Sequence, residues 1–415
     1  MKVRVIGSTK PGFCLPVDEA LIFSGHEAGI CYMADDYDAI ANEPVSRTLG
    51  RVRGTVGSGH HSVSGHVSYN LLLEGVPKII AMLLNNEKDY NTSEKSARYT
   101  KMGVTDEDVA MLESMDVPLP SGEEKEIYEK WIGKFSDLIS AEYPNIDSKT
   151  VDKLAKENAR YFISVFTPAT TMGYTVDLRQ LNYLIGFCDD YASEMSFDEF
   201  HAQLKPWVIK LSDLLASVAD VDGLRDNKGR KFSLFAPRRR HEEFGENYCT
   251  NYLGTFAQLA QAQRHRSLDY EMMVPSLDEA RFFVPPIIED KATRAEYLAD
   301  MEKLKEFYPQ GMLVWINERG TPENFALKCQ ERLCGAAQLE ICHQTYKTLG
   351  KYIIQCARSN EDVHNYLYDF YDKTKCRFGH YHCDRPCPLG PYQVFTRKIK
   401  LGSQRPKNRR ETGGF

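Results

Sequence analysis

The sequence predicts a folded protein built from two halves of similar size, and three observations support this. The chain has 415 residues, which is more than a typical single domain holds. Hydrophobic residues make up 42% and charged residues 27%, a balance typical of a globular protein with a buried core. A polar, glycine-containing segment from Asp220 to Lys231 divides the chain near its middle and predicts a linker or long loop.

The overall charge and the apolar pattern exclude several classes of protein. The net charge of -6 argues against a general nucleic-acid coat or a polybasic membrane binder. The longest apolar region, Tyr69 to Leu84, is interrupted by Asn70, Glu74 and Lys78, so no membrane-spanning helix is expected. The start of the chain lacks the apolar core of a signal peptide. The cysteines are scattered and predict reduced thiols. We therefore expect a cytoplasmic protein without nucleic-acid or membrane partners.

The first half is expected to combine a short strand with helices and polar turns. Its start, Met1 to Gly7, alternates in the manner of a strand. The later features, in chain order, are a histidine-rich turn (Gly59 to Ser62), an apolar helix (Leu71 to Leu84), a polar segment (Ser93 to Tyr99), a long charged helical stretch ending at Arg160, and an amphipathic helix from Tyr174 to Ile185.

The second half repeats much of this order. Its features are His241 to Phe244, an apolar helix from Tyr252 to Ala260, a polar segment from Gln261 to Arg266, Lys305 before Pro309, and a helix that starts at Thr321-Pro322-Glu323. The spacing between corresponding features differs between the halves, so the repeat is loose and carries insertions.

The segment from Gln261 to Arg266 is the most informative stretch of the chain. It places a glutamine, Arg264, His265 and Arg266 at the end of an apolar helix. A guanidinium offers a planar fork for a phosphate or for a heterocycle that becomes anionic. The alternative is a solvated helix end whose basic residues complement the helix dipole. Taken alone, the triplet favours this alternative.

Together, the motifs resemble those of the flavin-dependent thymidylate synthases, in two tandem copies. The first copy, residues 1–225, keeps the family's serine-arginine loop (Ser93 to Tyr99) but has Asn85-Asn86-Glu87-Lys88 where the family has Arg-His-Arg. The second copy, residues 226–415, keeps Gln261, the Arg-His-Arg triplet and Ala337 to Ile341, but lacks the serine-arginine loop. The resemblance implies an α+β fold with two copies of the synthase fold.

The losses in the two copies are complementary, which implies one composite site between the halves. By the resemblance, the substrate-binding residues are Glu94, Ser96, Arg98 and Arg160 from the first half and Gln261 and Arg332 from the second. Arg264 would act in catalysis, because a cation there can stabilise negative charge on the uracil carbonyl. The residues that match flavin-lining positions are His60, Arg179, His265 and Arg266.

The resemblance implies an FAD enzyme that methylates dUMP at C5, with methylenetetrahydrofolate as the carbon donor and NADPH as the reductant. Two chains would then form a homodimer that reproduces the family's four-subunit assembly. Two alternatives stay open, the first because of departures from the family pattern at Asp177, Lys305 and Glu271, and the second because the first half has Asn and Cys where the family has arginines. One is another C5 modification of a pyrimidine nucleotide, such as hydroxymethylation. The other is a paralogue that binds nucleotide or flavin without turnover.

A cysteine- and histidine-rich segment near the C-terminus is a further candidate site. Cys376, His380, His382, Cys383 and Cys387 are ligand types that zinc accepts, but the Cys-x-x-Cys spacing of common zinc sites is missing. A reduced loop without metal is the expected state, and no metal ligand is assigned.

Overall fold

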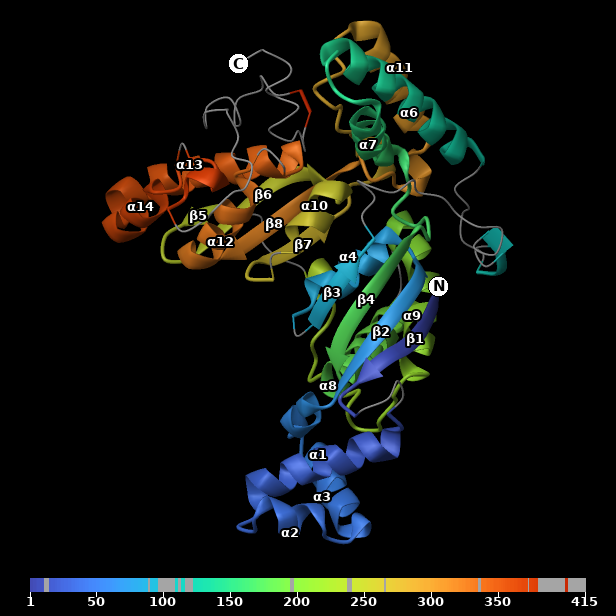
Figure 1. The fold of residues 1–415 in the computed structure, drawn as a ribbon, viewed down its shortest axis with the longest axis vertical. Helices are drawn as coiled ribbons and strands as arrows, with labels where there is room; N and C mark the ends of the chain where they lie inside the picture. Colours follow the sequence, from blue (N-terminus) through green and yellow to red (C-terminus); the bar gives the residue numbers. More distant parts are fainter. Residues whose placement is uncertain are drawn as a thin grey trace. The chain divides into compact units, whose positions relative to one another are not determined.

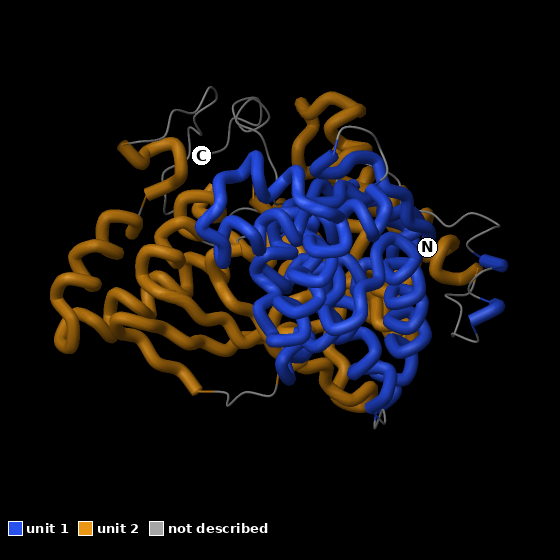
Figure 2. The backbone as a smooth tube through the Cα atoms, turned by 90° about the horizontal axis from the view of Figure 1, so that it is seen from below, with its two compact units in different colours: residues 1–95, 104–118, 168–232 blue, residues 96–103, 119–167, 233–415 orange. Residues whose placement is uncertain are grey.

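The chain forms two compact units, which Figure 2 distinguishes by colour. The computed structural model describes residues 1–10, 15–88, 90–95, 109–110, 113–115, 122–194, 198–236, 241–264, 266–334, 337–371, 373–379 and 400–401. Unit 1 comprises residues 1–95, 104–118 and 168–232, and unit 2 comprises residues 96–103, 119–167 and 233–415. In the described part of the chain, no helix is long and apolar enough to cross a membrane.

Unit 1 contains a four-stranded antiparallel sheet and several helices, which come before, between and after its strands in the sequence. Its elements are β1 (Lys2–Ser8), α1 (Val17–Tyr32), α2 (Tyr37–Ala41), α3 (Val45–Gly57), η1 (His61–His66), β2 (Ser68–Val76), α4 (Lys78–Asn86), β3 (Tyr90–Glu94), β4 (Thr170–Asp177), α8 (Leu178–Ser193) and α9 (Glu199–Ala216). The strand order is β1-β2-β4-β3, and Figure 1 shows α8 and α9 beside the sheet.

The strand β2 corrects the prediction of one apolar helix from Leu71 to Leu84. Tyr69, Leu71 and Leu73 are buried, whereas the residues between them are more exposed. This two-residue alternation is that of a strand with one buried face. The helix α4 begins only after Pro77. The run is apolar enough to suit either element, and the pairing of its first part with β1 and β4 selects the strand.

The helix α8 likewise starts later than predicted. The residues Tyr174 to Asp177 end β4, and Asp177 then caps the helix by accepting a hydrogen bond from the Gln180 backbone N–H at 2.6 Å. An aspartate before an amphipathic run is a common helix start. The predicted helix from Tyr174 to Ile185 is therefore wrong over its first turn and confirmed from Leu178 onward.

Unit 2 contains a second four-stranded antiparallel sheet. Its elements are α6 (Gly122–Glu142), α7 (Ser148–Ala159), η2 (Arg160–Phe162), η3 (Ser233–Phe235), β5 (Glu243–Phe244), β6 (Tyr248–Thr255), α10 (Phe256–Ala262), β7 (Asp269–Met273), η4 (Leu277–Glu279), α11 (Lys291–Lys303), η5 (Lys305–Phe307), β8 (Leu313–Gly320), α12 (Pro322–Arg332), α13 (Leu339–Ser359), α14 (Glu361–Tyr368) and η6 (Lys375–Arg377).

The second sheet has the order β5-β6-β8-β7, which matches that of the first sheet strand for strand. In both halves of the sequence a central strand is followed by a helix, an edge strand, a helical excursion (α6 and α7 in the first half, α11 in the second), the other central strand and a further helix. The predicted helix from Tyr252 to Ala260 is wrong over Tyr252–Thr255, which ends β6. The predicted start at Thr321-Pro322-Glu323 is confirmed, with Thr321 as the N-cap and Pro322 in the first turn.

The α+β class is confirmed, since the structure has two four-stranded antiparallel sheets with flanking helices. The long charged stretch of the first half forms α6 and α7, and these helices belong to unit 2. A compact unit and a sequence repeat are different divisions of the chain. The repeat boundaries 1–225 and 226–415 therefore remain a prediction.

The helical excursions of the two halves pack together within unit 2. The Trp131 ring on α6 meets the Tyr297 ring on α11 edge-on, with centroids 5.0 Å apart, and stacks on Phe162 at 5.5 Å. Lys130 bridges to Asp300 at 2.5 Å. The loops that follow the excursions pair at Ser164 and Pro309 in an antiparallel bridge. Aromatic packing and ion pairs thus join the excursions of both sequence halves.

Glu124, at the start of α6, is a buried carboxyl whose titration is expected to affect stability. It accepts hydrogen bonds from the Ser164 backbone N–H at 2.8 Å and from the Thr167 hydroxyl at 2.9 Å. Burial raises the pKa of Glu124 to about 7, and the two hydrogen bonds oppose that rise. Because the pKa of this carboxyl is higher in the folded than in the unfolded state, its protonated form stabilises the fold. This contribution is fully present below the unfolded-state pKa and is lost as pH rises through the folded-state pKa.

We expect Glu124→Gln to remove this pH dependence. As pH rises from about 4.5 to 7.5, the free energy of unfolding of the wild type should fall by about 3 kcal/mol relative to that of the variant. Denaturant unfolding at several pH values measures this difference. Glu123→Gln is the matched control, because Glu123 is the neighbouring glutamate and is exposed. Parallel curves for Glu124→Gln and the wild type would contradict the prediction.

Candidate functional site

The helix α10 carries the polar segment that the sequence singles out. Thr255 caps its start by accepting the Gln258 backbone N–H at 2.9 Å. Gln261 lies in the last turn, as predicted. Arg264 and Arg266 follow the helix and are exposed. His265 lies outside the described residues. The two arginines are therefore accessible to an anion in solution.

Arg332 and Gln261 lie together in unit 2. The Arg332 guanidinium on α12 donates to the backbone carbonyl of Gln261 at 3.0 Å. The side-chain oxygen of Gln261 is buried and has no hydrogen-bond partner. A buried acceptor without a partner costs free energy unless a ligand or water supplies a donor. This oxygen therefore suits an N–H group of a bound molecule.

Arg160 lies in a buried network at the start of α13. Its guanidinium donates to the Gln338 side-chain oxygen at 2.5 Å, and Arg160 is only 7% exposed. The Tyr161 hydroxyl donates to Glu340 at 2.6 Å, and the Thr255 hydroxyl donates to the other Glu340 oxygen at 2.7 Å. Arg160 comes from the first half of the sequence, whereas its hydrogen-bond partner Gln338 comes from the second.

Burial dominates the electrostatics of this network. It raises the pKa of Glu340, although hydrogen bonds from Tyr161, Thr255 and Gln338 act in the opposite direction. Burial, with the nearby Glu340 charge, also raises the pKa of Tyr161 well above its usual value. Tyr161 therefore stays protonated and serves as a fixed donor. Gln338 and Glu340 were recognised as a motif in the sequence, but their tie to Arg160 was not predicted.

In unit 1, Glu94 lies at the end of β3 and is held by side chains from α4 and β4. It forms an ion pair with Lys78 and accepts from the Asn85 amide at 3.3 Å and from the Thr170 hydroxyl at 3.4 Å. Asn85 is in the last turn of α4, the helix that takes the same place in its unit as α10. Ser96 and Arg98 lie outside the described residues.

His60 and Arg179 both lie in unit 1, near the buried histidine His61. The His60 ring is 3.3 Å from the Tyr32 hydroxyl. The next residue, His61, is buried and contacts the Tyr183 hydroxyl at 2.9 Å. Burial lowers the pKa of His61, and the positive charges of Lys228 and Arg179 lower it further. His61 is therefore neutral near pH 7 and was not singled out in the sequence as a site residue.

The three departures from the family pattern, Asp177, Glu271 and Lys305, all have structural partners. Arg179 pairs with Asp177 at 3.5 Å, so the aspartate both caps α8 and faces the arginine. Glu271 is buried in β7 and lies 3.4 Å from the Arg319 guanidinium. Lys305 forms an ion pair with Glu302 on the surface of unit 2.

The donor sets suit the two ligands that the resemblance implies. Gln261, with its unpartnered acceptor, and the exposed Arg264 suit the edge and carbonyl of a pyrimidine. The Arg179 guanidinium and the His60 imidazole suit an anionic, aromatic dinucleotide such as a flavin.

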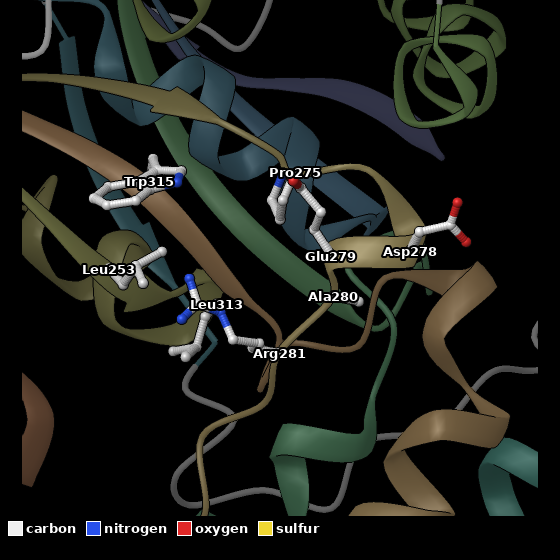
Figure 3. Close-up of a pocket in the computed structure, with 8 residues that line it drawn as sticks. All are labelled: Leu253, Pro275, Asp278, Glu279, Ala280, Arg281, Leu313 and Trp315. Carbon is white, nitrogen blue, oxygen red and sulfur yellow. The ribbon is translucent and has the colours of Figure 1, made fainter.

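A pocket of ≈ 550 Å³ lies in unit 2 on one face of the second sheet. Figure 3 shows Trp315 and Leu253 on one side, with the Arg281 guanidinium near Leu313 and the Asp278 carboxylate pointing away from the Trp315 ring. The lining contains none of the residues predicted for the site. The pocket was not predicted, because its residues come from β6, β8 and the loop around η4.

The cysteine- and histidine-rich segment falls largely outside the described residues. Only Cys376 is described, in η6, where its sulfur lies 3.3 Å from the Thr374 hydroxyl. Among the described residues, no group of three or more His, Cys, Asp or Glu side chains is placed to hold a metal ion.

Comparison with known proteins gives one match to a family model. Residues 24–194 match the family described as Thymidylate synthase complementing protein. No curated protein matches the chain. Thymidylate Synthase X (ThyX) from Helicobacter pylori, solved with FAD and dUMP, is 16% identical, covers 55% of this chain and 96% of its own, and has a TM-score of 0.33. The UMP/dUMP methylase PolB from Streptomyces cacaoi, bound with 5-Br dUMP, is 15% identical, covers 56% of this chain and 95% of its own, and has a TM-score of 0.34.

Proposed function

We propose that this chain is a flavin-dependent thymidylate synthase, which methylates dUMP at C5 with methylenetetrahydrofolate and NADPH. The observation that carries the proposal is the family match over residues 24–194, combined with the second half's Gln261 to Arg266. The matched segment contains Glu94, Ser96 and Arg98 but lacks Arg-His-Arg. The second half supplies that element, so the two halves together hold a complete set.

The topology supports a tandem duplication. Both sheets have the same strand order, and both have a helix after each central strand. The helices α4 and α10 occupy the same place in this order. The segment Asn85 to Lys88 therefore takes the place of Gln261 to Arg266, which agrees with a copy that has lost its arginines. A homodimer of such chains is the assembly that we propose.

In the proposed reaction, FAD supplies the hydride chemistry when bound, and the protein supplies position and charge. Gln261 accepts from an N–H of the pyrimidine through its side-chain oxygen. Arg332 holds the Gln261 backbone carbonyl, which fixes the end of α10. Arg264 faces the uracil carbonyl and stabilises the negative charge that develops there. Ser96 and Arg98 bind the phosphate with charge-assisted hydrogen bonds.

Arg160 has a different role in this proposal from the surface arginines. It is buried, and one of its donors is used by Gln338, whereas its Nε has no partner. It therefore contributes to phosphate binding through the remaining donors, while Gln338, Glu340 and Tyr161 hold its orientation. His60, Arg179, His265 and Arg266 contact the flavin.

Another C5 modification is the second candidate, and the departures at Asp177 and Glu271 favour it. Both carboxylates face arginines, which changes the charge available to substrate. Analysis of the product formed from labelled dUMP and labelled folate separates methylation from hydroxymethylation.

We expect the purified chain to carry FAD or to take it up on reconstitution. The absorption spectrum of the dialysed protein measures this directly, because bound flavin gives the protein a yellow colour. Protein that stays colourless after incubation with excess FAD would remove both enzyme proposals and leave a paralogue without flavin chemistry.

A further inference from the structure

The segment between the two halves lies against α8 of unit 1 and is anchored there. Asn227 is buried and donates to Asp190 on α8 at 2.9 Å. Arg225 bridges Asp189 at 2.8 Å and Asp220 at 2.6 Å. Gly186 on α8 leaves room for this segment, since a Cβ there would lie 2.4 Å from the Arg225 carbonyl oxygen. The segment thus has a defined position on the unit.

This anchoring brings two cations next to the His60 turn and Tyr183. The Lys228 ammonium donates to the backbone carbonyl of Gly59, the residue before His60. The Arg230 guanidinium lies over the Tyr183 ring, 4.5 Å from its centroid. Both side chains are exposed, so they remain accessible to a ligand. One donor of Lys228 is occupied by the carbonyl, and an ammonium has three.

The charges around this cluster are unbalanced. Lys228, Arg179 and Asp226 act on His61, and Arg230, Arg179, Asp226 and Asp177 act on Tyr183. These groups comprise three cations and two carboxylates. The excess positive charge lies beside an exposed histidine and two tyrosine rings, Tyr32 and Tyr183. Cations with adjacent aromatic faces suit a molecule that carries both phosphate and flat rings.

We infer that Lys228 and Arg230 of the inter-half segment bind the phosphates of a dinucleotide cofactor, beside His60 and Arg179. This inference rests on the proposed function for its choice of FAD as the ligand. The left-handed backbone of Lys228, with φ of 57°, agrees with a constrained loop that holds the side chain in place. The segment that joins the halves is therefore part of the site.

The test is FAD binding to the full chain, followed by flavin fluorescence, in variants of this segment. Lys228→Asn removes the charge and keeps a residue that tolerates the left-handed backbone. Arg230→Gln removes the second charge. Lys231→Gln is the matched control, because the neighbouring Lys231 is paired with Glu194. We expect FAD affinity to fall about tenfold or more in each of the first two variants. It should stay unchanged in the control, and dUMP affinity should stay unchanged in all three.

Equal FAD affinity in the wild type and all variants would overturn the inference and leave the proposed function standing. A wild-type chain that binds no FAD would instead overturn the proposed function. In that case, binding of inorganic pyrophosphate to the chain, measured as a rise in the melting temperature, tests the phosphate site of the segment separately. Stabilisation that Lys228→Asn and Arg230→Gln weaken, and Lys231→Gln does not, supports a phosphate site for another nucleotide. Stabilisation that is absent or equal in all variants overturns the inference as well.

Discussion

Lys328→Met is expected to destabilise unit 2 by about 3–5 kcal/mol, because it leaves a buried carboxylate without its counter-ion. Lys328 and Glu318 are both fully buried, and their ion pair measures 2.5 Å. Glu318 also accepts from the hydroxyls of Tyr248 at 2.8 Å and Tyr252 at 2.7 Å. Burial raises the pKa of both tyrosines well above the usual value, so they remain donors.

Denaturant unfolding measures this loss, with Lys351→Met as the control. Lys351 also pairs with a glutamate, Glu242 at 2.6 Å, but that pair is half-exposed and is expected to contribute about 1 kcal/mol at most. A loss for Lys328→Met no larger than that for Lys351→Met would show that the buried pair does not stabilise the sheet of unit 2.

Arg264→Ala is expected to lower kcat/KM for dUMP by about 100-fold or more, since the substitution removes both a dUMP contact and an electrostatic stabiliser of the transition state. The residue is exposed at the end of α10, so its loss should leave the free energy of unfolding nearly unchanged. Turnover of FAD-loaded protein, compared with the exposed Arg294→Ala on α11, measures the effect. A wild-type kcat/KM in Arg264→Ala would remove this residue from the catalytic machinery.

The sequence predicted the helices with clear caps and the polar end of α10. Thr321-Pro322 marks its helix start by local chemistry alone, and Gln261 follows an apolar run of helical length. It did not separate strand from helix in an apolar stretch that only a few polar residues interrupt, as from Leu71 to Leu84. There the sheet partners decide, and hydrogen bonds from β2 to both β1 and β4 select the extended form.

The tie of Arg160 to Gln338 could not be predicted either, because it joins residues from the two halves of the sequence. The complementary losses in the halves indicated that their residues would combine. They did not indicate that α6 and α7 would pack with α11 in unit 2. That arrangement depends on Trp131, Phe162 and Tyr297, whose contacts are tertiary.

The central claim is that dUMP binding needs residues from both sequence halves, and dUMP titration of FAD-loaded Arg98→Ala and Arg264→Ala tests it most directly. The account predicts that each variant loses dUMP binding, although the two residues come from different halves. It also predicts that mixing the variants restores little activity, because both residues must belong to one chain. Wild-type dUMP affinity in both variants would contradict the claim.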